Sequence, residues 1–514
     1  MKEGRKKYGM LLACMLVIIM MVTGCGGNNA DSDEADKNST KVEPSTVQTE
    51  APIELAPVEL TYYYPGAPQR DLMLVEEAMN KILTEKINTT IKLKAMDWGA
   101  LEQKVNVMSA AGEEYDLVFT APWFNNYFLN VSKGAYVELD DLLLKYAPTL
   151  YSSIPAEIWN ATRVNGKIYG SINYQIVAMP FGFDVRKDLA DKYQLDIDAV
   201  KKYEDLEPFF DKVLAGEKGV TPSIPLDFKA EPVYHGMDEI GETRSPGWYR
   251  IDDPTAKVIN QYATPEFKNT MEMGRRWREK GYFRKDAIGD LTAELKAGKF
   301  ATLIHWPAKP GGEFDEKTKN NFDGYPKALT PALVTTNRVI STMTAISASS
   351  KNPERAAMFL ELINTDKDLY NLLCNGIEGK HYKFTDKEKG VIGIADGEDP
   401  ANRGYAPGSD WMFGNQFNGY FTSIDAVGNW EKTIELNKTA TVSPLLGFNF
   451  NPEPVKTELT LLVALVDEYV PYLESGIGDD AKYEQFIKKL EASGLNKLME
   501  EKQKQIDEWM KTKK

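Results

Sequence analysis

The sequence predicts an α/β fold with two lobes, in which a parallel sheet is covered by helices. Between residues 58 and 120, segments rich in β-forming residues alternate with segments whose apolar side chains recur at helical spacing. A β-α-β-α-β succession of this kind predicts parallel strands joined by helices. The globular part, from about residue 58 to residue 514, is too long for one ordinary hydrophobic core. We therefore expect two lobes.

The strands and helices predicted between residues 58 and 120 indicate where a ligand would bind. The predicted elements are a strand at 58–64, a helix at 70–87, a strand at 90–96, a helix at 98–111 and a strand at 115–120. Ligands of open parallel sheets bind outside the carboxyl ends of the strands. The loops after these three strands are therefore expected to carry a site, at residues 63–66, 97–98 and 120–127.

The rest of the chain continues the alternation of strands and helices. Thr264 and Pro265 are typical of a helix start, as N-cap and first helical residue. The further predicted elements are extended segments at 177–183, 300–305 and 339–347, helices starting near 187, over 265–280, over 353–375 and over 459–470, and two helical segments after 480. Residues 383–414 are rich in Gly and Asp, and are predicted to form a long loop that is either functional or mobile.

The N-terminus has the pattern of a bacterial lipoprotein signal. Basic residues at positions 2–7 precede an apolar stretch from about Tyr8 to Val22, and Val22-Thr23-Gly24-Cys25 ends the segment. This predicts a signal peptide at 1–24, lipidation of Cys25 and attachment to the outer face of the cell membrane. A membrane-spanning anchor is the alternative, but the apolar stretch is short for one. Residues 25–57 are predicted to be a flexible tether, because they hold almost no large apolar side chains.

Composition excludes several kinds of partner and site. The net charge of −15 makes nucleic acid a poor partner. With three Cys and three widely separated His, the chain predicts no disulfide framework, no metal site and no cofactor. The acidic segment 396–399 lacks the ligand pattern of an EF-hand calcium loop and favours a solvated turn. No catalytic motif stands out, although a glycosidase needs only two suitably spaced carboxylates.

Seven short motifs follow one another along the chain, at 115–120 (YDLVFT), 165–170 (NGKIYG), 184–189 (DVRKDL), 297–303 (AGKFATL), 345–360 (AISASSKNPERAAMFL), 375–382 (NGIEGKHY) and 447–458 (GFNFNPEPVKTE). In this order they resemble those of the extracellular solute-binding lipoproteins of carbohydrate-type ABC importers, and more narrowly the LplA/LipO-like subgroup of Gram-positive bacteria. The resemblance covers essentially the whole globular part. It implies a monomer with two discontinuous lobes joined by hinge strands, a ligand between them, and delivery of that ligand to a permease. By this analogy lobe one is 58–178 plus 329–378, and lobe two is 179–328 plus 379–514.

A sugar site of that kind needs aromatic platforms beside polar side chains. Trp98 and Trp123 directly follow predicted strands, so ligand contact and packing are equally compatible with their positions. By the resemblance, Trp306 at a strand end is a candidate platform, with His305 as its polar neighbour or as a core residue. The remaining candidates are Asn173, Tyr174, Trp248, Trp411 and Asn415. Trp277 and Trp509 fit helical packing patterns instead.

Three functions fit these observations. The first is a binding protein that captures a carbohydrate, expected to be an oligosaccharide, and delivers it to an ABC permease without catalysing a reaction of its own. The second is a lipid-anchored extracellular glycoside hydrolase, and the third is a subunit that presents a ligand to a membrane sensor. The resemblance favours the first of these hypotheses.

Overall fold

The computed structural model describes residues 55–226, 231–284 and 291–512, and Leu55–Lys514 forms one compact unit. The predicted signal peptide, the predicted lipidation site Cys25 and all of the predicted tether before residue 55 lie outside the described residues. Across the described ranges, no helix combines the length and the apolar character that a membrane span requires.

The predicted parallel sheet is present. Strand β1 (Val58–Pro65) pairs in parallel with β2 (Thr89–Met96) on one side and with β3 (Leu117–Thr120) on the other. Helix α1 (Leu72–Ile87) joins β1 to β2, and α2 (Trp98–Ala111) joins β2 to β3. Two antiparallel strands, β14 (Met343–Ile346) and β6 (Ser171–Ile172), complete the order β2-β1-β3-β14-β6.

Local sequence explains where α2 begins and ends. The Asp97 carboxylate accepts a hydrogen bond from the Gly99 N–H at 3.1 Å, which caps the first turn. The helix stops at Gly112, whose φ of 65° is a left-handed conformation that glycine adopts without strain. The loop between β2 and α2 is therefore reduced to Asp97 alone, so Trp98 stands immediately beyond the sheet.

The first core lies around this sheet. It includes strand residues such as Leu60, Ile91 and Val118, together with Phe359 of α14 (Pro353–Thr365). Residues Tyr405, Met412 and Phe413 also belong to it. The family analogy places residues 379–514 in lobe two, and these lobe boundaries stay a prediction. The buried side chains of the segment around 405–413 pack into the first core.

The second core surrounds a three-stranded antiparallel sheet with β8 at its centre. Strand β8 (Phe181–Arg186) lies between β11 (Thr302–Pro307) and β12 (Gly324–Ala328). Gly182 permits the close approach of β12, because a Cβ there would lie 1.9 Å from the Lys327 carbonyl oxygen. Helices α7 (Lys187–Tyr193) and α8 (Glu207–Gly216) contribute buried side chains to this core.

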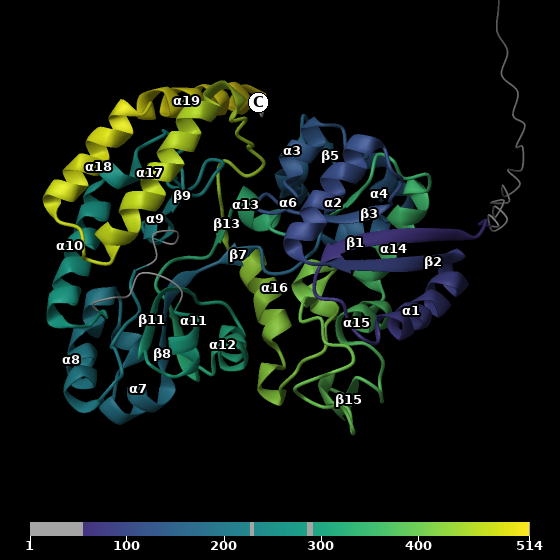
Figure 1. The fold of residues 1–514 in the computed structure, drawn as a ribbon, viewed down its shortest axis with the longest axis horizontal. Coiled ribbons are helices and arrows are strands. Elements are labelled where there is room, and N and C mark those ends of the chain that lie inside the picture. The colour runs from purple at the N-terminus through teal and green to yellow at the C-terminus, as the bar shows by residue number, and fades with distance from the viewer. Residues whose placement is uncertain (1–54, 227–230, 285–290, 513–514) are drawn as a thin grey trace, which may run out of the picture. The chain divides into compact units, whose positions relative to one another are not determined.

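The third core is mainly helical. It combines α10 (Pro265–Lys280) with the C-terminal helices α17 (Lys456–Glu474), α18 (Asp480–Ala492) and α19 (Leu495–Thr512). Figure 1 shows these C-terminal helices in yellow and yellow-green, with α17 beside α10. The predicted start of α10 is confirmed, since the Thr264 hydroxyl accepts from the Phe267 N–H and Pro265 is the first helical residue.

The structure also contains the following shorter helices and strands, several of which contribute to the first core. They are α3 (Tyr127–Ser132), α4 (Asp140–Tyr146), α5 (Pro148–Ser153), α6 (Ala156–Trp159), β4 (Arg163–Val164), β5 (Lys167–Ile168), β7 (Ala178–Met179), α9 (Glu231–Tyr234), β9 (Met237–Asp238), β10 (Tyr249–Arg250), α11 (Thr292–Lys296), α12 (Gly312–Asn320), β13 (Leu333–Val334), α13 (Thr336–Val339), α15 (Lys367–Asn375), β15 (Tyr382–Asp386), β16 (Val391–Ile394), α16 (Asn429–Thr439) and β17 (Thr441–Val442).

Three predicted elements differ from the structure. The helix predicted over 353–375 is two helices, because Asp366 interrupts it and caps α15 by accepting from the N–H groups of Asp368 and Leu369. The predicted loop 383–414 contains most of an antiparallel hairpin, formed by β15 and β16. The extended segment predicted at 339–347 begins instead with the end of helix α13.

Candidate functional site

Three tryptophans from distant parts of the sequence meet at the surface of the first core. We call Trp98, Trp123 and Trp411 the tryptophan cluster. The ring centroids of Trp98 and Trp123 are 5.6 Å apart, those of Trp98 and Trp411 6.4 Å, and those of Trp123 and Trp411 6.3 Å. The planes of Trp98 and Trp411 are inclined by only 9°. Trp98 is 38% exposed and Trp123 55% exposed, whereas Trp411 is half-buried.

The parallel sheet places two of these rings. Trp98 is the first residue of α2 and follows the carboxyl end of β2, while Trp123 follows the carboxyl end of β3. Both β2 and β3 pair with β1 in parallel, so their carboxyl ends lie at the same edge of the sheet. This is the edge at which the sequence predicted a site. Trp411 reaches it from a short 3₁₀ turn at Asp410–Met412.

Two phenylalanines lie among the three indoles. Phe119 of β3 is fully buried and contacts all three indoles edge-on, with centroid distances of 6.0–6.4 Å. Phe124 packs edge-on against Trp98 at 4.9 Å. The exposed rings therefore rest on a rigid aromatic base. Sequence reasoning missed both phenylalanines, although their positions within and after a predicted strand could have indicated them.

Hydrogen bonds to the segment before β14 hold the cluster in place. The Trp123 indole N–H donates to the Ser341 carbonyl oxygen at 2.8 Å. Gln175 Nε2 donates to the Trp411 carbonyl oxygen at 2.9 Å and to Thr342 Oγ1 at 2.8 Å. Ser341 and Thr342 thus hold two of the three tryptophans, one directly and one through Gln175. Nothing in the sequence singled out these three residues.

Asn173 is buried behind the cluster. Its Nδ2 donates to the Met412 carbonyl oxygen at 2.6 Å, and its Oδ1 accepts from Thr344 Oγ1 at 3.1 Å. The amide is therefore occupied by contacts that tie the Trp411 turn to β14. Asn173 thus helps to position Trp411, because it holds the backbone carbonyl of the next residue, Met412.

Tyr174 and Asn415 lie together in the same region. The two residues form an isolated parallel bridge, with the Gln416 N–H donating to the Tyr174 carbonyl oxygen at 2.9 Å. The Tyr174 ring is buried edge-on against Phe417. Asn415 caps a 3₁₀ turn by accepting from the Phe417 N–H. Both side chains hold the segment that follows the cluster.

The other three candidates lie in different surroundings. Trp306 is half-buried against the second core, and His305 is buried with its ring against Tyr203 and Tyr234. Trp248 is 1% exposed, and its indole N–H donates to the Ser245 carbonyl oxygen at 3.1 Å. Trp248 is therefore packed inside the protein. The structure does not bring any of the three into contact with the tryptophan cluster.

The most strongly shifted carboxyl groups also lie away from the cluster. Burial, reinforced by Glu316 and Glu313, raises the pKa of Asp184 on β8 to about 8. Burial raises the pKa of Asp238 on β9 to about 7, against the hydrogen bond that Tyr249 donates to it at 2.8 Å. Within the described part of the chain, no group of three or more His, Cys, Asp or Glu residues could hold a metal ion.

The chemistry of the cluster is that of an aromatic platform. Exposed indole faces stack well on flat, weakly polar C–H surfaces, and the pyranose ring presents such a surface between its hydroxyl groups. The arrangement is therefore suited to binding a ligand that presents such a surface.

Comparisons with known proteins point the same way. Residues 74–368, more than half of the chain, match the family model described as bacterial extracellular solute-binding protein. Residues 444–511 match a domain of unknown function. A carbohydrate ABC transporter substrate-binding protein of Streptococcus pneumoniae is 28% identical over 520 residues, which covers 99% of each chain.

Solved structures from the same organism are also similar. The N-glycan transport solute binding protein NgtS of Streptococcus pneumoniae superposes with a TM-score of 0.78 at 28% identity, covering 89% of this chain and 100% of that one. The same protein in complex with Man5GlcNAc superposes with a TM-score of 0.66 over the same shares of the two chains.

Proposed function

Because the chain belongs to the bacterial extracellular solute-binding protein family, we propose that it captures an oligosaccharide at the tryptophan cluster and delivers it to an ABC permease. Its similar proteins are substrate-binding proteins of ABC transporters, so the chain is a binding protein and not an enzyme. The two-lobed solute-binding fold expected from the sequence is likewise the fold of these proteins.

The exposed indoles of Trp98 and Trp123 carry the proposal of a sugar site. Indole is a large apolar surface, and its exposure to water is unfavourable by roughly 25 cal/mol per Å². A ligand that covers the two rings recovers this free energy, and aromatic stacking adds about 0.5–1.5 kcal/mol for each well-placed pair. The hydrogen bond from Trp123 to Ser341 keeps that ring in place before the ligand arrives.

The size of the platform favours more than one sugar unit. Three indoles with centroids 5.6–6.4 Å apart form a surface wider than any one of them. A single pyranose ring, about as large as one aromatic ring, would leave the others in water. The similarity to a protein solved with Man5GlcNAc supports the same class, and makes a mannose-containing N-glycan the first ligand to test.

The cellular setting is part of the proposal. The signal pattern that ends at Cys25 supports attachment of a mature chain to the outer face of the cell membrane through lipid. A monomer on a tether of about 30 residues would reach a permease in the same membrane. Membership of the narrower LplA/LipO-like subgroup stays a prediction that rests on the sequence motifs.

A thermal-shift screen tests the proposed function. The protein is heated with Man5GlcNAc, with other oligosaccharides and with monosaccharides, and positive results are followed by calorimetry. A ligand at 100 times its Kd stabilises the folded state by about 2.7 kcal/mol, which raises the melting temperature measurably. We expect an oligosaccharide to give the largest shift. A panel in which no sugar raises the melting temperature would contradict the proposal.

A further inference from the structure

Helix α13 is a short junction between three separate parts of the chain. Thr336 Oγ1 donates to the Leu445 carbonyl oxygen at 3.2 Å and accepts from the Gly447 N–H at 3.0 Å. The next residue, Asn337, donates from Nδ2 to Glu239 Oε1 at 2.6 Å and to the Gly241 carbonyl oxygen at 3.2 Å. The guanidinium of Arg338 then lies 5.1 Å from the centre of the Phe181 ring.

These contacts determine where α13 lies. The helix has four residues, and a single helical turn has no stability of its own in water. Its position must therefore come from its contacts with other parts of the chain, which are these polar contacts and the burial of Val339 and Ile340 in the first core. The bond from Asn337 to Glu239 is short and has a carboxylate acceptor, which makes it stronger than a bond between neutral groups.

The junction leads directly to the tryptophan cluster. The helix ends at Val339, and Ser341, two residues later, supplies the carbonyl oxygen that accepts the Trp123 indole N–H. Thr342 then contacts Gln175, which holds the backbone of Trp411. A displacement of α13 would therefore move the acceptor of Trp123 first.

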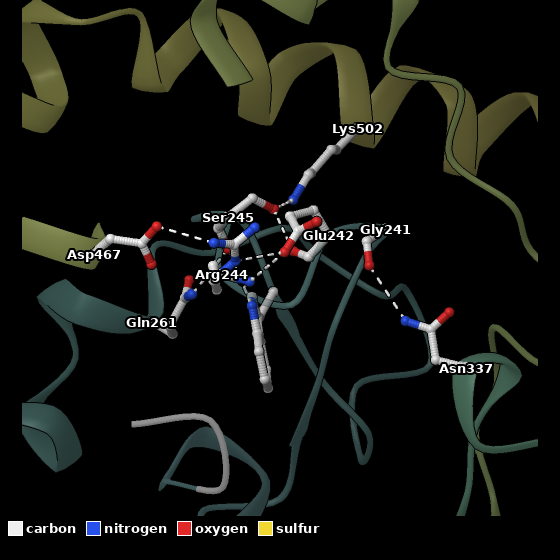
Figure 2. A network of polar contacts seen from close by, with 9 residues as sticks. Gly241, Glu242, Arg244, Ser245, Gln261, Asn337, Asp467 and Lys502 are labelled. Atoms are coloured by element: carbon white, nitrogen blue, oxygen red, sulfur yellow. Dashed lines mark hydrogen bonds and ion pairs between the residues drawn. The ribbon is translucent and has the colours of Figure 1, made fainter. Parts of the chain in front are cut away.

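On its other side, Asn337 contacts a segment that is itself firmly held. In Figure 2, Lys502 of α19 points at this segment, and Arg244 lies between Glu242 and Asp467 of α17. Lys502 is fully buried, and its Nζ donates to Ser245 Oγ at 2.7 Å, to the Pro246 carbonyl oxygen at 2.7 Å and to the Gly247 carbonyl oxygen at 3.1 Å. These three bonds use all three donors of an ammonium group.

The segment is closely packed where Asn337 contacts it. Gly241 has a φ of 78°, and a Cβ there would lie 3.1 Å from the Phe450 ring of the third core. The segment from Gly241 to Gly247 is thus fitted closely against residues 444–511, the region that matches a domain of unknown function.

We propose that Asn337 is a positioning residue for the binding site: it ties α13, and through Ser341 the indole of Trp123, to the Gly241–Gly247 segment that the C-terminal region holds. Residues 444–511 then hold the Gly241–Gly247 segment, and through it the part of the binding site that contains Trp123. The consequence for sugar affinity rests on the proposed function, whereas the placement of the Trp123 ring does not.

Fluorine NMR tests the placement without any ligand. The protein is labelled with 5-fluorotryptophan, and Trp123→Phe, Trp98→Phe and Trp277→Phe identify three of the nine signals. In Asn337→Ala we expect the Trp123 signal to shift or broaden, while the signal of Trp277, which is buried in the second core, stays in place. Glu239→Ala should reproduce the effect, and Glu239→Gln, which keeps an acceptor oxygen, should largely restore the native signal.

The matched control is Gln505→Ala. Gln505 exchanges two hydrogen bonds with the Asn451 backbone in the same C-terminal region, but it does not contact α13. It should lower the melting temperature without moving the Trp123 signal. A folded Asn337→Ala protein with an unchanged Trp123 signal would overturn the proposal, as would equal movement of the Trp123 and Trp277 signals.

Affinity separates this inference from the proposed function. With an oligosaccharide identified by the screen, Asn337→Ala should weaken binding by about tenfold or less, and this loss should disappear in a Trp123→Ala background. Additive losses in the double variant would overturn the route through Trp123. If no sugar binds at all, the proposed function fails while the fluorine signals still decide the placement.

Discussion

Replacing Trp123 with Ala tests the binding site most directly. The ring is 55% exposed, so less than half of its surface contributes to the stability of the folded protein. A fully buried Trp→Ala change costs about 3–5 kcal/mol, and the exposed fraction reduces the packing loss here to roughly 2 kcal/mol. The loss of affinity should be at least as large, at about 2 kcal/mol or thirtyfold in Kd, because an aromatic platform of this kind is a binding hot spot.

The assay compares chemical denaturation with calorimetric titration of the oligosaccharide on the same variants. Trp123→Phe keeps a smaller ring and should recover part of the affinity. Trp277→Phe is the control, because Trp277 is completely buried in the second core and should affect stability alone. A folded Trp123→Ala protein that binds the oligosaccharide with an unchanged Kd would refute the assignment of Trp123 to the site.

Four further expectations follow from the chain. If Trp306 forms a second platform opposite Trp98, Trp306→Ala should also weaken sugar binding by about thirtyfold, and an effect on stability alone would place it in the second core. Cys25→Ser should release the protein from the membrane fraction or leave it unprocessed, and unchanged fractionation and mature mass would argue against lipidation. Small-angle scattering should give a smaller radius of gyration at saturating oligosaccharide if the lobes close by hinge bending, and identical curves with confirmed binding would contradict the hinge. Asp184, whose pKa burial raises to about 8, binds its proton more tightly in the folded than in the unfolded protein, so stability should fall as pH rises from about 4 to 8, by at most about 1.4 kcal/mol per unit. Asp184→Asn should flatten that slope, and a variant with the same pH profile as the original protein would show that this carboxyl is not the cause.

Local sequence patterns are sufficient to predict the parallel sheet and the edge of it where Trp98 and Trp123 lie. The alternation of strand and helix patterns between residues 58 and 120 is local, and each element there is specified by its own side-chain periodicity. Trp98 and Trp123 could be chosen because the ends of parallel strands converge whatever the rest of the chain does. Their exposure and mutual contact agree with that choice, although binding itself stays a prediction.

Periodicity was insufficient wherever a short polar contact decided the structure. The break at Asp366 depends on a single side chain that caps α15, and apolar spacing continues across it. The hairpin of β15 and β16 lies in a segment whose Gly and Asp content indicated a loop. Such features are set by individual hydrogen bonds, which a pattern of apolar residues does not record.

The residues that complete the cluster come from distant segments and are brought together by folding. Trp411 lies 288 positions after Trp123 in the sequence, and it reaches the same surface because the segment around 405–413 packs into the first core. Ser341, Gln175 and Asn337 have no recognisable pattern, since their roles consist of backbone and amide contacts across the fold. Local sequence fixes the helices and strands through short-range sterics and periodicity, whereas contacts between remote segments exist only once the chain has closed its loops and buried its apolar surface.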